Sequence, residues 1–527
     1  MVAYPAISLP TIVSLVWFRL VRLRIGDTEM LIDRLAKLQN ALAIALSGFL
    51  CLMVVAYSTG ASALPSFARQ TGQNCVSCHA GGQFPELTPY GRFFKMTGYT
   101  IGTRGVPLSV MGVLSAAKVS DSSKSDDTTV DFQKNGAVMF ATGSVFLAGK
   151  ITDNIGMFVQ NTYDNYSSQS VGPNGALGRW KGHSQADNMD FRYADHFIDS
   201  GRDLIVGVSV NNNPSISDPW NSAAAWMQYV PGASPTSHQF VDGPYPGYGA
   251  GGNLAGASVY AYLNKKIYGE LGLYRTANRA LSFMSAGISG INTTQLGGTN
   301  PYWRFAYTHE WGAHNLMLGT SGMVAHVFDA GSDLSDPNNR GKFKNIGIDA
   351  QYQYLLDPHT VTVQAAFMRQ VTTYSANTFA AAASPYFLAN GVTPVSTANP
   401  ADTTNTFRAK ATYVYQAKYG GSVSYFNVRG TTNTLNQTAG FDSTGLITTT
   451  DPNGTGITST RVNGNVTGNP ATNGFVFEGF WTPVQYIRVG AQYTAYNKFN
   501  GASDNYDGFG RNARDNNTFR LYLWAAY

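Results

Sequence analysis

Apolar and polar residues alternate with a period of two along several segments between residue 107 and the C-terminus. In the clearest run, which begins at Phe407, the alternate positions Arg408 and Lys410 are charged. This period is typical of a β-strand with one apolar and one polar face. Charges on the polar face suit a water-filled lumen, and the apolar face suits lipid. The same alternation predicts strands within residues 346–354, 360–367 and 487–495.

The links between the predicted strands alternate in length. Eight long and seven short links indicate roughly sixteen antiparallel strands, with the short turns on the periplasmic side. Long polar links are predicted at about residues 118–135, 164–189, 212–253, 277–300, 327–342, 374–404, 430–472 and 498–516, and short turns near Lys150, Gly201, Lys265, Trp311, Pro358, Gly420 and Pro483.

The C-terminus and the unequal links favour a membrane barrel over other all-β folds. The last predicted strand, residues 519–527, alternates to a terminal tyrosine, as outer-membrane proteins commonly end. A β-helix would show a repeat of short fixed period, which the sequence lacks, and the loops are too unequal for a soluble β-sandwich. The sequence therefore predicts an all-β fold, a roughly 16-stranded antiparallel outer-membrane β-barrel.

The composition agrees with this fold and excludes some functions. Charged residues occupy 13% of the 527 positions, whereas soluble globular proteins carry roughly 25%. The 30 tyrosines and 56 glycines suit strands that face lipid on one side and the lumen on the other. The formal net charge of +5 is small and scattered, so outer-membrane lipid is an expected partner and nucleic acid is not.

Residues 1–63 are predicted to be an export segment. Basic residues follow Met30, residues 41–57 are apolar, and residues 61–63 read Ala-Ser-Ala. This order is typical of a secretory signal with a small-residue cleavage site, so translation is predicted to begin at Met30 and the mature chain at Leu64. A membrane anchor is the alternative interpretation, because the apolar run is long for a signal.

The strongest chemical signal is the motif Cys75-Val76-Ser77-Cys78-His79. Its two thiols are spaced to add to the two vinyl groups of one haem, and the adjacent imidazole then becomes the proximal iron ligand. A zinc site would need two more ligands at matching spacing, and the only other cysteine, Cys51, belongs to the export segment. A thioredoxin-like dithiol would need a βαβ context that the surrounding sequence does not have. We therefore predict one covalent haem c held by Cys75, Cys78 and His79.

The distal iron ligand is less constrained by the sequence. Met96 follows the motif at a distance that a short loop can fold back over, and methionine opposite histidine raises the reduction potential. Packing is the competing interpretation of this methionine. The other candidates are histidines in the predicted barrel, namely His183, His196, His238, His309, His314, His326 and His359.

The chain thus divides into residues 1–63, a haem segment at 64–106 and a barrel at 107–527. About 43 residues is near the size below which a domain needs covalent or partner support. We therefore expect the haem segment to plug the lumen, or to lie at its periplasmic side, rather than to fold alone.

Two stretches of the sequence resemble a known family. Residues 65–72, the haem motif, residues 84–92 and Gly98-Tyr99 look like the fused outer-membrane monohaem cytochrome-porins of iron-oxidising bacteria, and residues 211–226 resemble an element of the same family. The resemblance implies a porin barrel joined to one c-type haem, with electrons passing from extracellular Fe(II) to periplasmic c-type cytochromes. The two haem cysteines and His79 correspond to the family motif, whereas no iron(II)-binding residues carry over.

Three functions remain open at this stage. The first is an outer-membrane electron conduit with Fe(II)-oxidising activity, and the second is a conduit for another donor or acceptor, such as a sulfur compound or a partner cytochrome. The third is a passive porin whose haem is structural or sensory. Loop carboxylates offer hard oxygen ligands that would attract Fe(II), although such residues more often only solvate a loop; they are Asp121, Asp126, Asp127 and Asp131.

Overall fold

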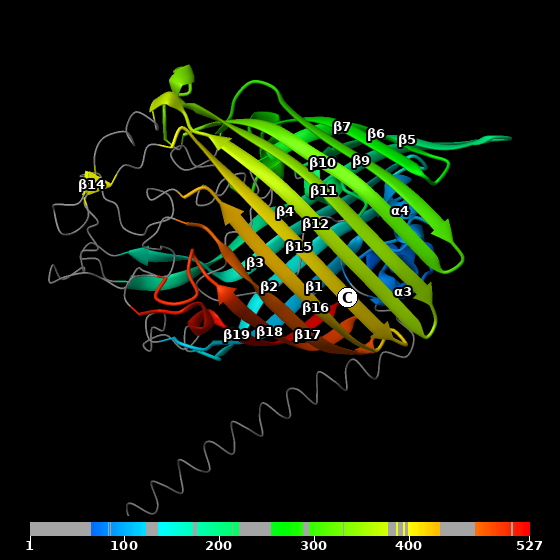
Figure 1. Ribbon diagram of the computed structural model, residues 1–527. Helices are drawn as coiled ribbons and strands as arrows, with labels where there is room; N and C mark the ends of the chain where they lie inside the picture. Colours follow the sequence, from blue (N-terminus) through cyan, green and yellow to red (C-terminus); the bar gives the residue numbers. More distant parts are fainter. Residues whose placement is uncertain are drawn as a thin grey trace, which may run out of the picture. The chain divides into compact units, whose positions relative to one another are not determined.

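Sixteen long strands pair edge to edge in chain order and close into a barrel in the computed structural model (Figure 1). They are β1 Leu108–Val119, β2 Val138–Lys150, β3 Ile155–Val171, β4 Leu177–Asp199, β5 Arg202–Asn211, β6 Leu254–Leu263, β7 Ile267–Thr276, β9 Asn300–Trp311, β10 His314–Phe328, β11 Arg340–Leu356, β12 His359–Thr373, β15 Ala401–Tyr415, β16 Tyr419–Gly430, β17 Thr472–Val484, β18 Ile487–Lys498 and β19 Thr518–Ala526.

The structure describes residues 65–82, 84, 86–122, 135–171, 177–212, 214–220, 254–287, 295–329, 331–377, 386–387, 394–395, 399–432, 469–506 and 510–527. The predicted export segment therefore lies outside the described residues.

The closure of the barrel is antiparallel and regular. The first strand, β1, pairs with the last, β19, from Met111 opposite Ala526 to Val119 opposite Thr518. Every other junction between the long strands is antiparallel too, which confirms the predicted sixteen-stranded fold. Three two-residue strands stand apart from this count: β8 Gln295–Leu296 adds to the end of β10, and β13 Tyr386–Phe387 pairs with β14 Pro394–Val395.

The predicted connections are correct except in one long link and two short turns. Residues 164–189 were expected to form a link, but β3 continues to Val171 and β4 begins at Leu177. Backbone pairing continues through this stretch, for example between Ser168 and Lys181. Its sequence is polar without a period of two, so it carries no hydrophobic signal of a strand. The turns expected near Gly420 and Pro483 lie at residues 416–418 and 485–486 instead.

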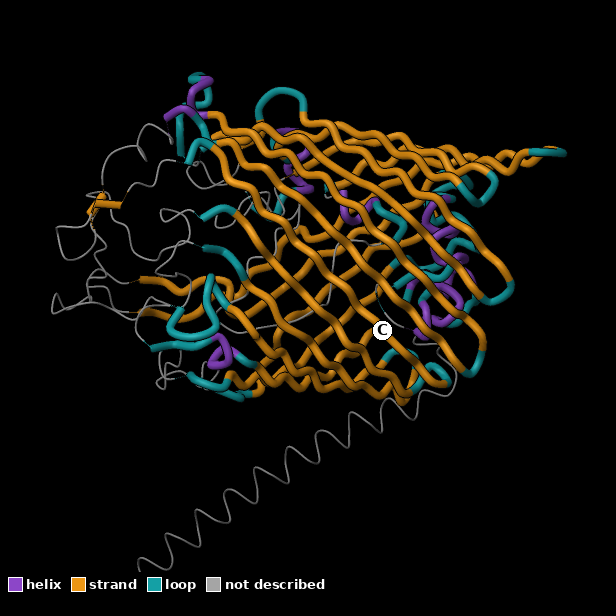
Figure 2. The backbone as a smooth tube through the Cα atoms, viewed as in Figure 1, coloured by secondary structure: helices purple, strands orange, loops and turns teal. Residues whose placement is uncertain are grey.

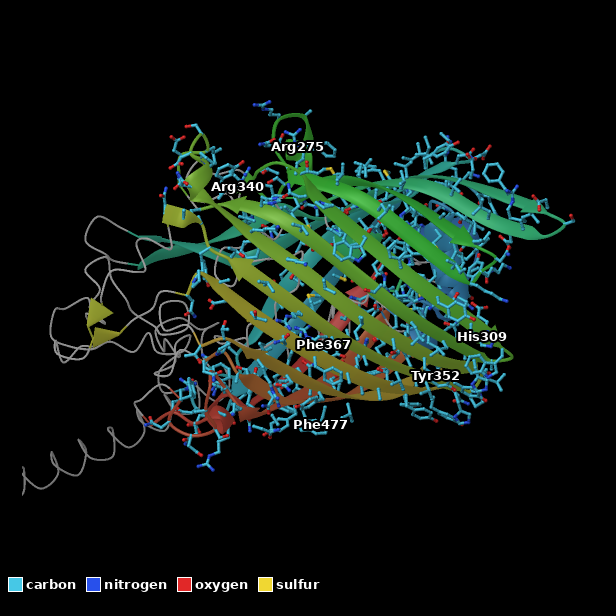
Figure 3. All side chains as sticks on the ribbon, turned by 45° about the horizontal axis from the view of Figure 1, so that its top comes forward. Arg275, His309, Arg340, Tyr352, Phe367 and Phe477 are labelled. Atoms are coloured by element: carbon cyan, nitrogen blue, oxygen red, sulfur yellow. The ribbon has the colours of Figure 1, made fainter. Side chains whose placement is uncertain are left out.

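The outer wall of the barrel is apolar, with aromatic residues gathered toward the short turns. Alternate side chains of the strands face outward, so Ile348 is 60% exposed and Leu271 57%. Near the short turns the outward residues include Trp311, Tyr413 and Trp481. Figure 3 labels Phe367 and Phe477 on the outer wall, His309 and Tyr352 toward the short-turn end, and Arg275 and Arg340 at the opposite end.

An apolar band bordered by aromatic residues is the surface of an outer-membrane β-barrel, with the short turns on the periplasmic side. This confirms the predicted location of the protein in the outer membrane. Among the described residues no helix is long and apolar enough to cross a bilayer.

The segment before β1 folds into short helices that lie inside the barrel at the short-turn end (Figure 2). Contacts with opposite parts of the wall fix it there: Gln70 accepts from the Lys150 N–H, Arg92 donates to Gln353, and Glu86 pairs with Lys410. Its elements are α2 Ser66–Thr71, α3 Cys75–Cys78, the 3-10 turn η1 Ala80–Gly82 and α4 Pro89–Met96. We call residues 65–106 the plug.

The start of α4 packs against the motif of Cys75, Cys78 and His79. The Thr88 hydroxyl accepts from the Gly91 N–H at 3.1 Å, and Pro89 occupies the first turn, where its missing N–H costs nothing. A Cβ atom at Gly91 would lie 2.1 Å from the Cys78 carbonyl oxygen. Only glycine therefore lets α4 approach α3 this closely.

Candidate functional site

The motif cysteines occupy the two ends of one helical turn. Cys75 and Cys78 bound α3, and neither forms a disulfide. The His79 N–H donates to the Cys75 carbonyl oxygen at 2.8 Å, so the histidine continues directly from this turn. The Cys75 N–H donates to Gln485 Oε1 at 3.2 Å, which ties the motif to the turn between β17 and β18. The structure thus brings the three predicted site residues together on one short helix fixed to the wall.

The two thiols are not in an environment that activates cysteine. Burial raises the pKa of Cys75, and burial together with the neighbouring Cys75 raises the pKa of Cys78 to about 11. A redox-active or metal-binding thiol has a lowered pKa, because the thiolate is the reactive form. Among the described residues, no group of three or more His, Cys, Asp or Glu side chains is placed to hold a metal ion.

His79 lies on the side of the plug that faces β19. Its ring centroid is 4.0 Å from that of Phe84, and the Phe84 centroid is 5.2 Å from that of Trp524 on β19. Residues 79 and 87 form an isolated β-bridge that closes the loop between them. An aromatic wall beside an imidazole is a suitable boundary for a flat apolar cofactor such as haem.

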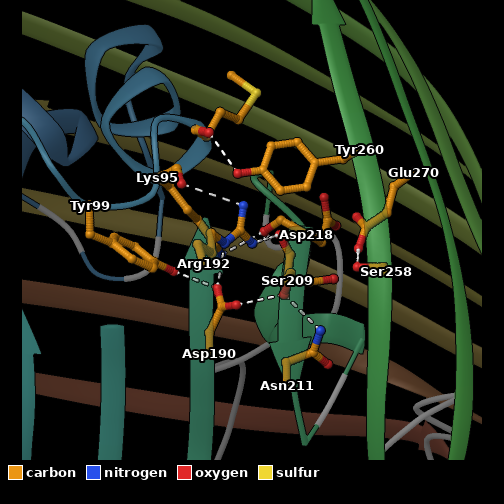
Figure 4. A network of polar contacts seen from close by, with 12 residues as sticks. Lys95, Tyr99, Asp190, Arg192, Ser209, Asn211, Asp218, Ser258, Tyr260 and Glu270 are labelled. Carbon is orange, nitrogen blue, oxygen red and sulfur yellow. Dashed lines mark hydrogen bonds and ion pairs between the residues drawn. The ribbon is translucent and has the colours of Figure 1, made fainter. Parts of the chain in front are cut away.

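On the other side of the lumen, α4 docks through a buried polar network (Figure 4). Arg192 Nε donates to Asp190 Oδ2 at 2.7 Å, and both side chains are fully buried. Asp190 also accepts from the Tyr99 hydroxyl at 2.6 Å and from the Ser209 hydroxyl at 2.6 Å. Tyr99 belongs to the plug and the other residues to β4 and β5, so the Tyr99 hydrogen bond to the ion-paired Asp190 joins the plug to the wall.

A segment that follows β5 completes the network from inside the lumen. This segment contains α5 Pro214–Ser217 and then Asp218 and Trp220. Lys95 Nζ donates to the Asp218 carbonyl oxygen at 2.9 Å, and Arg304 pairs with the Asp218 carboxylate at 3.3 Å. Burial and the nearby Arg192 lower the pKa of Lys95 to about 8. We call this stretch, residues 214–220, the inner segment.

The inner segment is a functional element whose role the sequence did not predict. Residues 211–226 were noted only for their family resemblance, and the described part of that stretch contacts α4 directly. The Arg92 guanidinium carbon lies 6.0 Å from the Trp220 ring centroid, and that of Arg304 lies 5.4 Å from it. The nearest signal in the sequence was the spacing of Asp190 and Arg192, which places two charges on one face of a strand.

Met96 lies on the side of the lumen where α4 meets β4, β5 and the inner segment. We call this the network side. Its side chain is 1% exposed and belongs to a buried cluster with Trp220, Tyr260 and Tyr268. None of Cys75, Cys78 and His79 belongs to that cluster. The assignment of Met96 as distal iron ligand stays a prediction.

The loop carboxylates fall mostly outside the described residues. Of the four, only Asp121 is described; its N–H donates to the Asp515 carbonyl oxygen at 3.0 Å, and its own carbonyl oxygen accepts from Arg511 at 2.9 Å. These contacts use its backbone and leave the proposed attraction of Fe(II) a prediction.

Comparisons with known proteins find similar structures but no similar sequences. No family model matches the chain, and no curated protein matches it. OmpF of Salmonella typhi, solved with daunomycin, aligns over 80% of this chain and 97% of its own with 11% identity and a TM-score of 0.39. The channel DcaP of Acinetobacter baumannii aligns over 80% and 96% with 10% identity and a TM-score of 0.36. OmpT of Vibrio cholerae aligns over 80% and 96% with 9% identity and a TM-score of 0.38. With scores this low, the barrel assignment rests on the strand pairing.

Proposed function

We propose that this porin-like barrel conducts electrons across the outer membrane through one haem c bound at Cys75, Cys78 and His79. The observation that carries the proposal is the position of the motif, which is held inside the lumen at the short-turn end. A haem there would be in reach of a periplasmic cytochrome. Extracellular Fe(II) is the proposed donor, on the strength of the family resemblance.

The residues present fit a covalent haem. The two thiols stand on one helical turn, the imidazole follows them, and Phe84 and Trp524 provide an aromatic wall. When bound, the haem would supply reversible one-electron chemistry at its iron. Cys75 and Cys78 would anchor it and His79 would be its proximal ligand, while the plug would keep bulk water from its surroundings.

The plug also explains why a barrel would suit an electron conduit. Sixteen-stranded porins leave an aqueous channel, but here helices and the inner segment occupy the lumen and contact both β4 and β15. An electron could cross such a barrier through a cofactor, and the same plug would hinder the passage of solutes. The donor would then be oxidised outside the cell without entering it.

A passive porin with a structural or sensory haem is the second candidate. The observation that favours it is the architecture itself, because sixteen strands are typical of solute channels. Planar-bilayer conductance distinguishes the two candidates. We expect far lower conductance than an open sixteen-stranded channel gives, and a large haem-independent conductance would favour the porin.

Haem staining of a denaturing gel tests the cofactor. We expect the wild-type band to stain and Cys75→Ala to lose the stain, because a haem without its thioether bonds dissociates on denaturation. Val76→Ala is the matched control, since Val76 stands in the same turn and is 41% exposed. A stained Cys75→Ala protein, or an unstained wild type produced with a functional haem-attachment system, contradicts the assignment.

Stopped-flow spectroscopy tests the donor. Purified protein in the oxidised form is mixed with Fe(II), and the haem α-band is followed. Fast reduction is the expected result for an Fe(II)-oxidising conduit. Reduction by dithionite but not by Fe(II) would keep the haem and move the function to another donor, such as a sulfur compound.

A further inference from the structure

The lumen wall beside His79 is formed by β18 and β19. Trp524 on β19 contacts Phe84, the neighbour of His79, with ring centroids 5.2 Å apart. Arg488 on β18 is the direct register partner of Trp524. The two side chains therefore stand next to each other on the inner face, at the level of the haem motif.

Each of these two side chains has a buried N–H donor without a partner among the described residues. Arg488 uses one terminal nitrogen to pair with Glu478 at 3.0 Å, but its Nε–H meets no acceptor in the described part of the chain. Trp524 is 7% exposed, and its indole Nε1–H meets no acceptor there either. Nearly all buried donors in proteins meet an acceptor. Two adjacent ones therefore indicate a binding position for an acceptor oxygen.

The Arg488 side chain is held in place and its charge reaches the plug. Its guanidinium carbon lies 3.9 Å from the Phe480 ring centroid and 5.8 Å from that of Tyr522. Although burial alone would raise the pKa of Glu86 on the plug, Lys410 and Arg488 hold that pKa below its usual value. The Arg488 guanidinium, which shares its charge with Glu478, is thus held in place and lies within electrostatic reach of the loop that follows His79.

The remaining step rests on the proposed haem. A haem carries two propionate carboxylates, and attachment at Cys75 and Cys78 confines them to the neighbourhood of His79. We propose that the Arg488 guanidinium and the Trp524 indole N–H form a propionate-binding site and donate to one haem carboxylate. Arginine is suited to this role because its planar fork matches a carboxylate.

Other unpartnered groups of the lumen wall do not offer the same site. The amides of Asn345 and Gln351 on β11 also lack partners, but they are neutral and carry both donors and acceptors, so water satisfies them equally well. Arg488 and Trp524 present only donors. A ligand rich in acceptor oxygens fits this pair better than water does.

An equilibrium redox titration of the purified holoprotein tests the site. A propionate charge stabilises Fe(III), and Arg488 offsets that charge, so Arg488→Gln should favour the oxidised form. We expect about a tenfold shift of the Fe(III)/Fe(II) equilibrium, which for a one-electron couple corresponds to about 59 mV. Trp524→Phe removes only one neutral hydrogen bond and should shift it about threefold in the same direction.

Resonance Raman spectroscopy supplies a second readout. The propionate bending band should move to lower frequency in both variants, as it does when a carboxylate loses donors. Arg488→Lys should restore part of the shift in potential. Because both donors address one carboxylate, the effects of Arg488→Gln and Trp524→Phe should not add in the double variant.

Two matched controls separate this site from general effects. Lys498→Gln removes the same charge from the same strand, about 33 Å further along it, and Trp481→Phe makes the same change on the outer wall, where Trp481 is 48% exposed. Neither should shift the potential. If Arg488→Gln and Trp524→Phe behave like these controls in haem-stained, folded protein, the propionate site is wrong while the haem assignment stands. If wild-type protein carries no haem, the proposed function itself fails. Should Arg488→Gln not fold, the conservative Trp524→Phe still decides.

Discussion

The two sides of the lumen differ in how fully their buried charged side chains are hydrogen-bonded. On the network side, α4 and the inner segment meet β4 and β9, and each charged side chain there, including Asp190, Arg192 and Arg304, has a hydrogen-bond partner. On the side of β18 and β19, donors of Arg488 and Trp524 are buried without an acceptor among the described residues. On the first side the charged groups are satisfied by the protein, although the Trp220 indole N–H of the inner segment also lacks an acceptor there. The second side is complete only with a further group, which is why we assign structure to one and ligand binding to the other.

The largest expected effect comes from breaking the network side. Arg192→Met leaves Asp190 buried without its cation, and such a loss typically costs about 3–5 kcal/mol. Denaturant unfolding followed by the haem Soret band should show the plug released early, while far-UV circular dichroism of the barrel changes later. Arg202→Met is the control, because Arg202 and Asp199 form a pair that is about half exposed on both sides, worth roughly 0–1 kcal/mol. Equal losses of stability in the two variants would show that the buried ion pair contributes no more than the exposed one.

An intermediate loss of stability is expected at the ion pair between Glu86 on the plug and Lys410 on β15. Glu86→Gln weakens the 2.8 Å contact with Lys410, and hydrogen bonds to charged groups contribute about 1.5–3 kcal/mol. The folded pKa of Glu86 lies below its ordinary value. The stabilisation is therefore fully present above the ordinary carboxyl range, near 4.5, and is lost as the pH falls through the lowered folded pKa.

The same two probes measure this pH dependence. The Soret-detected midpoint of the wild type should fall on acidification below about pH 4.5, the ordinary value for a glutamate, and that of Glu86→Gln should fall less. Parallel pH profiles of the two proteins would show that Glu86 does not hold the plug.

The smallest effect on stability is expected at Met96. Met96→Leu keeps the apolar volume, so the cost should stay below about 1.5 kcal/mol. If Met96 is the distal iron ligand, the reduction potential should nevertheless fall and the optical spectrum change, because an axial methionine raises the potential. A spectrum identical to that of the wild type would leave Met96 as a packing residue of the cluster around Trp220.

Sequence reasoning about the fold succeeded where the signal is local. The period of two around Phe407 and Ile348 reports directly which face meets lipid. The strand count followed from the alternation of long and short links between such runs. The hairpin of β3 and β4 was partly missed because its polar outer part has no such period.

The contacts on the network side could not be predicted, because they join residues that lie far apart in the sequence. Tyr99 and Asp190 are 91 positions apart, and Lys95 and Asp218 are 123 apart. Their contacts depend on strand register and on the inner segment turning into the lumen, neither of which leaves a pattern in neighbouring residues. A single aspartate two positions before an arginine is too common a pair to mark a buried interface.

The pairing of β1 with β19 also sets an order of assembly. The chain cannot close its barrel until β19 is available to pair with β1, and in the closed barrel Cys75 is only 6% exposed. If the proposed haem is added by an enzyme that has to reach both thiols, attachment has to come before this closure. Under that proposal, a chain whose barrel closes before it receives its cofactor would stay without haem.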